Sequence, residues 1–196
     1  LTPVRKQYLE IKNKYPDEIV FFRLGDFYET FDKDAEITSR ELDIVLTSRN
    51  VAKGQRVPMA GIPFHAADNY IARLIKKGYH VAICEQVGEQ PQGGLFPRKV
   101  VRVITPGTVV ESGLIASDKN NYLAAVFGLD GKFGFSYADL STGEFAVTEI
   151  TGENVRDQML SEISRLNPAE IIIPDHFEIF WNDLYFVSRY PKWKFE

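Results

Sequence analysis

The residue types that could support catalysis are few in this chain and lie far apart. One cysteine and three histidines are scattered through 196 residues, without the close spacing that a metal-binding motif requires. Asp130, Glu162 and Asp175 could be imagined as the converging carboxylates of a two-metal nuclease. Their contexts favour other roles: an Asp-Gly turn for Asp130, a helix whose apolar face points elsewhere for Glu162, and the end of a strand for Asp175. We therefore expect neither a catalytic residue nor a metal site.

A phosphate-binding loop is also missing from the sequence. Such a loop reads Gly, four residues, Gly, Lys and then Ser or Thr, because its backbone and its lysine hold the phosphates. The nearest approach begins at Gly88 and reaches Gly93, but Gly94 and Leu95 follow. No Ser/His/Asp or Cys/His set stands in a supporting motif either. We expect that this chain is not an enzyme and holds no cofactor of its own.

Basic side chains occur in a pattern that a nucleic acid could use. Arg98, Lys99 and Arg102 form a cluster, and on a regular strand Arg98 and Arg102 would share a face that Lys99 does not. Residues 1–110 carry 16 Lys and Arg against 13 Asp and Glu, whereas residues 111–196 carry 7 against 14. Such asymmetry is typical of chains with one part facing nucleic acid. Ordinary solvated surface charge is the alternative interpretation.

The elements that must position these side chains alternate between helix and strand as far as about residue 110. Apolar residues at helical spacing predict helices at 3–15, 34–42 and 67–75. Short apolar runs predict strands at 19–22, 44–47, 81–84 and 100–104. Two prolines and a glycine exclude regular helix at 58–63, and residues 90–97 form a loop rich in Gly and Pro. The first part is therefore mixed α/β: a mixed β-sheet with flanking helices.

The pattern changes after a polar stretch at 111–121. Three strands at 122–129, 133–139 and 144–150, joined by tight turns, predict a meander. A helix at 153–166 and a buried strand at 171–173 follow. Three antiparallel strands, a helix and a further strand form the opening of a ribonuclease H-like layout, which the chain leaves incomplete. We expect two domains, 1–112 and 113–196.

Composition sets the broad class of the protein. With 44% hydrophobic and 26% charged residues the chain is an ordinary globular protein. No apolar run approaches the ~18 residues of a membrane-spanning helix, and no charged-then-apolar leader precedes Thr2. The one cysteine, Cys84, cannot form an internal disulfide, which fits a reducing cytoplasm.

Four stretches, taken together, resemble the N-terminal region of bacterial MutS proteins. They are Gly25-Asp26-Phe27-Tyr28-Glu29, Pro58-Met59-Ala60-Gly61-Ile62-Pro63-Phe64-His65, Ala82-Ile83-Cys84-Glu85-Gln86 and Arg98-Lys99-Val100-Val101-Arg102-Val103-Ile104-Thr105-Pro106-Gly107-Thr108. Any one of these alone would be weak evidence, but four long matches in order and at matching spacing are specific. The resemblance runs from Thr2 to Trp193. It implies a mismatch-recognition domain followed by part of a connector domain.

The resemblance also assigns roles to residues that the pattern alone would not single out. Judged by its type, Phe27 would be a core residue, as we expect Phe21, Phe22 and Phe31 to be. The resemblance instead implies that Phe27 is a wedge that stacks on bases from the minor groove, and that Glu29 accepts a hydrogen bond from the displaced base. The residues that it implies lie near the DNA backbone or minor groove are Arg49, Met59, Arg98 and Lys99.

The same resemblance implies partners for the whole protein. These are double-stranded DNA with a mismatch or a small loop, a MutL-type partner bound through the connector, and a second copy in a homodimer. ATP and magnesium would be used by an ATPase that this chain lacks, and the location would be the bacterial cytoplasm, at the nucleoid when in use. The alternative is a module that binds only other proteins, a role that the acidic second part fits better than DNA binding.

Overall fold

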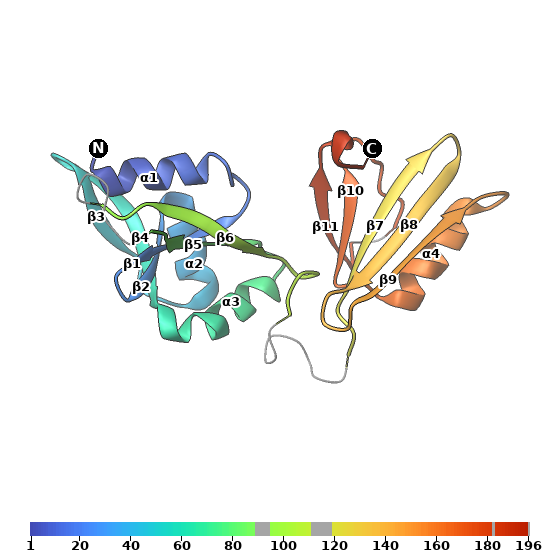
Figure 1. Cartoon of the computed structure of the whole chain (residues 1–196), viewed down its shortest axis with the longest axis horizontal. Helices are drawn as coiled ribbons and strands as arrows, with labels where there is room; N and C mark the ends of the chain where they lie inside the picture. The colour runs from blue at the N-terminus through green and yellow to red at the C-terminus, as the bar shows by residue number, and fades with distance from the viewer. Residues whose placement is uncertain (89–94, 111–118, 182, 196) are drawn as a thin grey trace. The chain divides into compact units, whose positions relative to one another are not determined.

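A computed structural model of the chain (Figure 1) describes residues 1–88, 95–110, 119–181 and 183–195. The chain divides into two compact units, Leu1–Thr105 and Pro106–Glu196. The predicted loop at 90–97 and the polar stretch at 111–121 lie largely outside the described residues. Within the described residues, no helix is both long and apolar enough to cross a membrane.

The first unit is built on a six-stranded sheet with the order β3-β4-β2-β1-β5-β6. Its strands are β1 (Ile19–Leu24), β2 (Phe27–Phe31), β3 (Thr47–Ala52), β4 (Gln55–Pro63), β5 (Val81–Gln86) and β6 (Arg98–Ile104). The pair β1–β5 is parallel and the other neighbours are antiparallel, so the sheet is mixed, as predicted.

Three helices flank this sheet: α1 (Pro3–Lys12), α2 (Asp32–Leu42) and α3 (Ala67–Ile75). The Thr2 hydroxyl caps α1 by accepting the Arg5 N–H at 3.3 Å, and proline suits the first helical position. Figure 1 shows α1 on one side of the sheet and α2 and α3 on the other. Helix α1 buries Tyr8 and Ile11 in one apolar cluster with strand residues that include Phe22.

Three strands of the first sheet differ from the sequence prediction. The strand predicted at 44–47 is wrong: β3 begins only at Thr47, and Val45 is 81% exposed. The αL residue Asp43 ends α2 immediately before this segment, and the apolar run Ile44-Val45-Leu46 joins no sheet. Strands β2 and β4 were not predicted. The residues of β2 show no clean alternation of buried and exposed positions, and the segment that forms β4 contains two prolines and a glycine.

The second unit has a five-stranded sheet with the order β11-β10-β7-β8-β9. Its elements are β7 (Tyr122–Leu129), β8 (Lys132–Asp139), β9 (Glu144–Ile150), α4 (Val155–Leu166), β10 (Glu170–Pro174) and β11 (Phe186–Tyr190). Strands β7, β8 and β9 form the predicted antiparallel meander. Strand β10 lies parallel to β7 and to β11. The predicted order of meander, helix and further strand is confirmed, and the whole chain is mixed α/β.

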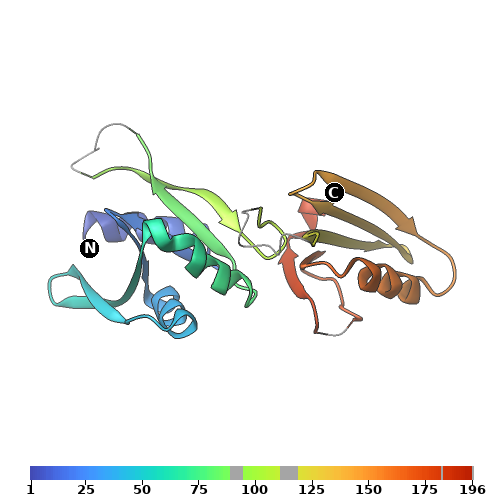
Figure 2. The same cartoon turned by 90° about the horizontal axis from the view of Figure 1, so that it is seen from below.

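Helix α4 covers one face of the second sheet (Figure 2). Its buried residues Met159, Ile163 and Leu166 share a core cluster with Phe135 and Ile171 of the strands. These three residues recur at helical spacing, which places them on one side of α4. The opposite side of α4 is left for polar residues.

One glycine is required by close packing in the second unit. A Cβ atom on Gly107 would lie 2.6 Å from Leu123 Cδ1 and 2.9 Å from Glu170 Cβ, distances that real Cβ atoms do not show. The Gly107 N–H donates to the buried Glu170 carboxylate at 2.9 Å. The Pro106-Gly107 turn is thereby fixed against β7 and β10.

Candidate nucleic-acid interface

The large aromatic side chain of Phe27 is exposed to solvent on the first unit. It is the first residue of β2 and is 47% exposed, whereas Phe21, Phe22 and Phe31 are at most 2% exposed. The turn before it passes through Gly25 at φ +59°, a left-handed conformation that glycine adopts without strain. Phe27 is therefore not a core residue, while the other three are, as predicted.

Glu29 lies beside Phe27 on the same face of the sheet. Residues two apart on a strand point the same way, and Gly61 of β4 is the partner opposite Glu29. A Cβ atom on Gly61 would lie 3.7 Å from Glu29 Cγ and 3.9 Å from Phe27 Cδ1. A Cβ atom at position 61 would therefore be in ordinary van der Waals contact with both side chains.

Arg49 of β3 forms an ion pair with Glu29, its Nη1 donating to Glu29 Oε2. The Glu29 side chain is 14% exposed and that of Arg49 is 40% exposed. Strand β4 separates β2 from β3, and its residues Val57, Met59 and Gly61 share one face by alternation. Arg49 is opposite Val57 and Glu29 is opposite Gly61, so the ion pair crosses β4 on the face that carries Met59.

The two predicted contacts on β6 differ in accessibility. Lys99 is exposed, but Arg98 is buried, with 9% of its surface accessible. Arg98 Nε donates to the Arg23 carbonyl at 2.7 Å, and its Nη1 donates to Gln7 Oε1 at 3.2 Å and to the Phe96 carbonyl at 3.0 Å. Burial lowers the pKa of the Arg98 guanidinium. Arg98 therefore holds β1, α1 and β6 together, and its burial argues against the predicted contact with DNA.

The predicted common face of Arg98 and Arg102 is also wrong. A bulge shifts the register between β5 and β6, so that Cys84 pairs with Val100 while the preceding Ile83 pairs with Arg102. The extra residue, Val101, reverses the alternation along β6. Arg98 and Arg102 consequently point to opposite faces of the sheet.

A cluster on the opposite face of the sheet supports the start of β2, and no motif in the sequence predicts it. The Tyr28 hydroxyl donates to Glu85 Oε1, and Arg23 Nη1 lies 3.9 Å from the same oxygen. Burial, followed by the hydrogen bond to Glu85, raises the pKa of Tyr28 to about 12. Arg23 also covers the Phe64 ring, 3.6 Å from its centre. Phe27 is thus exposed on a strand whose other face is anchored.

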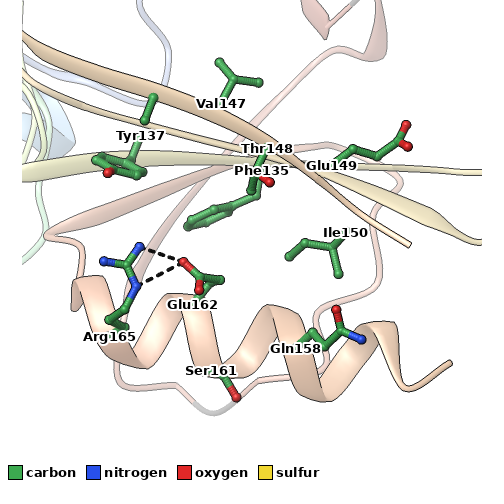
Figure 3. A pocket seen from close by; sticks show the side chains of 11 residues that line it. Phe135, Tyr137, Val147, Thr148, Glu149, Ile150, Gln158, Ser161, Glu162 and Arg165 are labelled. Carbon is green, nitrogen blue, oxygen red and sulfur yellow. Dashed lines mark hydrogen bonds and ion pairs between the residues drawn. The ribbon is translucent and has the colours of Figure 1, made fainter. Parts of the chain in front are cut away.

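The second unit has a surface cleft of about 520 Å³ between β9 and α4 (Figure 3). Phe135 and Ile150 line its sheet side, and Glu162 and Arg165 pair at 2.7 Å at one end of its helix side. Glu162 is thereby bound within its own helix. Asp130 lies in the β7–β8 turn and Asp175 follows β10 beside His176. Among the described residues, no three His, Cys, Asp or Glu side chains are grouped so that they could hold a metal ion.

Comparison with known families matches each part of the chain separately. The family model described as MutS domain I matches residues 2–113, and the one described as MutS domain II matches residues 121–196. The first match contains Phe27, Glu29, Arg49 and Met59, and the second contains the sheet that α4 covers.

Individual relatives extend this similarity to the level of whole sequences. The chain is 55% identical over 175 residues to the DNA mismatch repair protein MutS of Dehalococcoides mccartyi, covering 89% of this chain and 20% of the relative. It is 51% identical to the protein of the same name from Halothermothrix orenii, covering 91% and 20%. The corresponding protein of Alkaliphilus oremlandii is 47% identical, covering 100% and 24%. The chain thus spans a fifth to a quarter of the length of these relatives, and it belongs to the MutS family.

Proposed function

We propose that this chain is the mismatch-reading part of a DNA mismatch-repair protein. In this proposal it recognises mismatched or unpaired bases in double-stranded DNA by inserting Phe27 from the minor groove, while Glu29 contacts the displaced base. The observation that carries the proposal is the exposed Phe27 ring beside Glu29, on a sheet whose other phenylalanines are buried. The names of the relatives support the same function.

The physical basis is the low cost of deforming DNA at a mismatch. Weak pairing and stacking at one step make the duplex there easier to kink. An aromatic wedge tests for this by replacing a lost base stack, an interaction worth ~1–3 kcal/mol per base. Every base has a π face, so one ring can read many kinds of mismatch. Phe27 needs no sequence-specific contact to do so.

The neighbouring residues would hold the duplex against the wedge. Arg49, Met59 and Lys99 would lie near the DNA backbone or minor groove. Arginine and lysine neutralise phosphates, and arginine also enters a narrowed minor groove.

The wider activity of the protein is part of the same proposal. The domains would divide as 1–112 for mismatch recognition and 113–196 for a partial connector, ribonuclease H-like in layout. The connector would bind a MutL-type partner, and its acidic excess suits a protein partner better than DNA. A full-length protein carrying this chain would be a homodimer and a DNA-dependent ATPase that uses ATP and magnesium in other domains, and would act in the bacterial cytoplasm at the nucleoid.

The experiment compares Phe27→Ala with Phe145→Ala in a full-length protein that carries this chain. Phe145 is 69% exposed in the second unit, so its removal controls for the loss of any exposed ring. Binding is measured on matched duplexes with and without one mismatch. Phe27→Ala should abolish the preference for the mismatch and leave the melting temperature near that of wild type, while Phe145→Ala should keep the preference.

Two outcomes would contradict the proposal. A core Phe→Ala change costs about 3–5 kcal/mol, so a strongly destabilised Phe27→Ala variant would make Phe27 structural. A stable Phe27→Ala variant that still prefers the mismatch would show that another residue reads it.

A further inference from the structure

Glu29 and Arg49, which form an ion pair with each other, are the two charged residues beside Phe27 that would contact DNA in the proposed function. Glu29 would meet a base and Arg49 would meet a phosphate, yet in the unbound protein each is the other's partner. The arginine reaches over β4 from β3 to make this contact. While the pair persists, Arg49 is less available to neutralise a phosphate.

The surroundings of the pair allow it to be exchanged. Arg49 is 40% exposed at its side chain, and partly solvated ion pairs contribute little stability. The other ion pair near β2, between Arg23 and Glu85, lies on the opposite face of the sheet and does not compete. Gly61 has no side chain to pack against Glu29, whose Cγ would lie 3.7 Å from a Cβ atom at that position.

We propose that Glu29 and Arg49 exchange partners at a mismatch and that Arg49 is thereby a specificity-determining residue. On a perfect duplex no base is displaced, so Glu29 keeps Arg49 and the arginine stays off the backbone. At a mismatch the displaced base takes the Glu29 carboxylate, and the released Arg49 binds a phosphate. The gain of one phosphate contact then depends on the gain of the base contact. This inference rests on the proposed function of Phe27 and Glu29.

The salt dependence of binding measures this exchange. Each phosphate that a cation neutralises changes the slope of log K against log salt concentration by about −0.9. The slope is measured for a full-length protein carrying this chain, on a perfect duplex and on the same duplex with one mismatch. The exchange predicts a steeper slope on the mismatched duplex than on the perfect duplex. Arg49 should contribute about 0.9 to the difference between these two slopes.

Substitution of either residue of the ion pair should remove the part of the slope difference that comes from Arg49, one by changing the mismatch slope and the other by changing the perfect-duplex slope. Arg49→Ala should make the mismatch slope shallower by about 0.9 and leave the perfect-duplex slope unchanged. Glu29→Gln frees Arg49 on both duplexes, so the perfect-duplex slope should steepen by about 0.9 and the mismatch slope should stay the same. Arg49→Gln, which keeps most of the side chain over β4, should behave as Arg49→Ala does.

Arg56 provides the matched control, because it is an exposed arginine on the same β3–β4 hairpin. In the part of the chain that the structure describes, its Nη2 donates to the Ser48 carbonyl. Arg56→Ala should leave the difference between the two slopes unchanged. The inference is overturned if Arg49→Ala shifts both slopes equally, or if Glu29→Gln leaves the perfect-duplex slope as it was. Either result leaves the proposed function standing so long as Phe27→Ala still abolishes mismatch preference. Loss of that dependence on Phe27 would instead overturn the proposed function.

Discussion

At the scale of single residues, exposure separates the side chains that hold the first unit together from those that face solvent. Asp34 is 3% exposed and accepts from the Val20 N–H at 2.9 Å and from Lys12 Nζ at 2.9 Å. Arg98 makes three hydrogen bonds from a buried position. These charged groups are structural although their types suggest binding. Phe27 has the type of a core residue and is exposed.

The adjacent residues Arg98 and Lys99 allow a direct test of this separation. Arg98→Ala should destabilise the first unit by about 1–3 kcal/mol, because the partly buried carbonyl groups of Arg23 and Phe96 lose their donor. Lys99→Ala removes an exposed cation and should change stability by less than about 0.5 kcal/mol. Urea denaturation followed by circular dichroism measures both. Equal stabilities for the two variants would mean that Arg98 is not a structural residue.

The candidate site was predictable from sequence only through the resemblance to a family. Residue type alone places Phe27 in the core, and Glu29 has the type of an ordinary surface acid. The Glu29–Arg49 pair joins residues 20 positions apart across an intervening strand, so it depends on the order β3-β4-β2. The burial of Arg98 depends equally on contacts with α1 and β1, which no local pattern reveals.

At the scale of elements, strong apolar periodicity predicted well which helices and strands exist, and it predicted their first and last residues less well. Helices α1 to α4 and the strands β1, β5, β6, β7, β8, β9 and β10 are found where apolar patterns indicated them. The failures have physical causes. The run Ile44-Val45-Leu46 is apolar, but it follows the left-handed Asp43 and is not in the sheet. The bulge at Val101 changes which β6 residues share a face, and no residue type marks it.

The C-terminal ends of α2 and α3 are joined by a carboxylate. Glu41 accepts from Lys77 Nζ at 2.8 Å and from the Tyr79 hydroxyl at 3.1 Å, and Arg40 Nη2 lies 2.8 Å away. The hydrogen bond from Lys77, followed by that from Arg40, lowers the pKa of Glu41 to about 2. In an unfolded chain a glutamate titrates near pH ~4.3.

The stability that Glu41 contributes should therefore depend on pH. Its pKa is lower in the folded state, so its contribution is complete above about pH 4.3 and is lost as the pH falls towards 2. Unfolding by urea at pH 7, 5, 4 and 3 should show wild type more stable than Glu41→Gln by a constant amount at pH 7 and 5. The gap should narrow below pH 4. A gap that stays constant to pH 3, or widens, would contradict the assignment.

At the scale of the whole chain, two units with opposite charge balance are joined in sequence. The first has a small basic excess and carries Phe27, Glu29 and Arg49, while residues 111–196 carry twice as many acidic as basic residues. Each has its own sheet and its own apolar core. Under the proposed function, the first unit would read DNA and the acidic second unit would contact a protein partner.

In the proposed function, Phe27 enters the base stack at a mismatch. The most direct measurement places 2-aminopurine, a base whose fluorescence rises when it is unstacked, next to a mismatch. A full-length protein carrying this chain should raise that fluorescence on binding, and it should not do so on the matched duplex. With Phe27→Ala, at concentrations that saturate the DNA, the rise should disappear. An undiminished rise in fluorescence with Phe27→Ala would show that Phe27 does not enter the base stack.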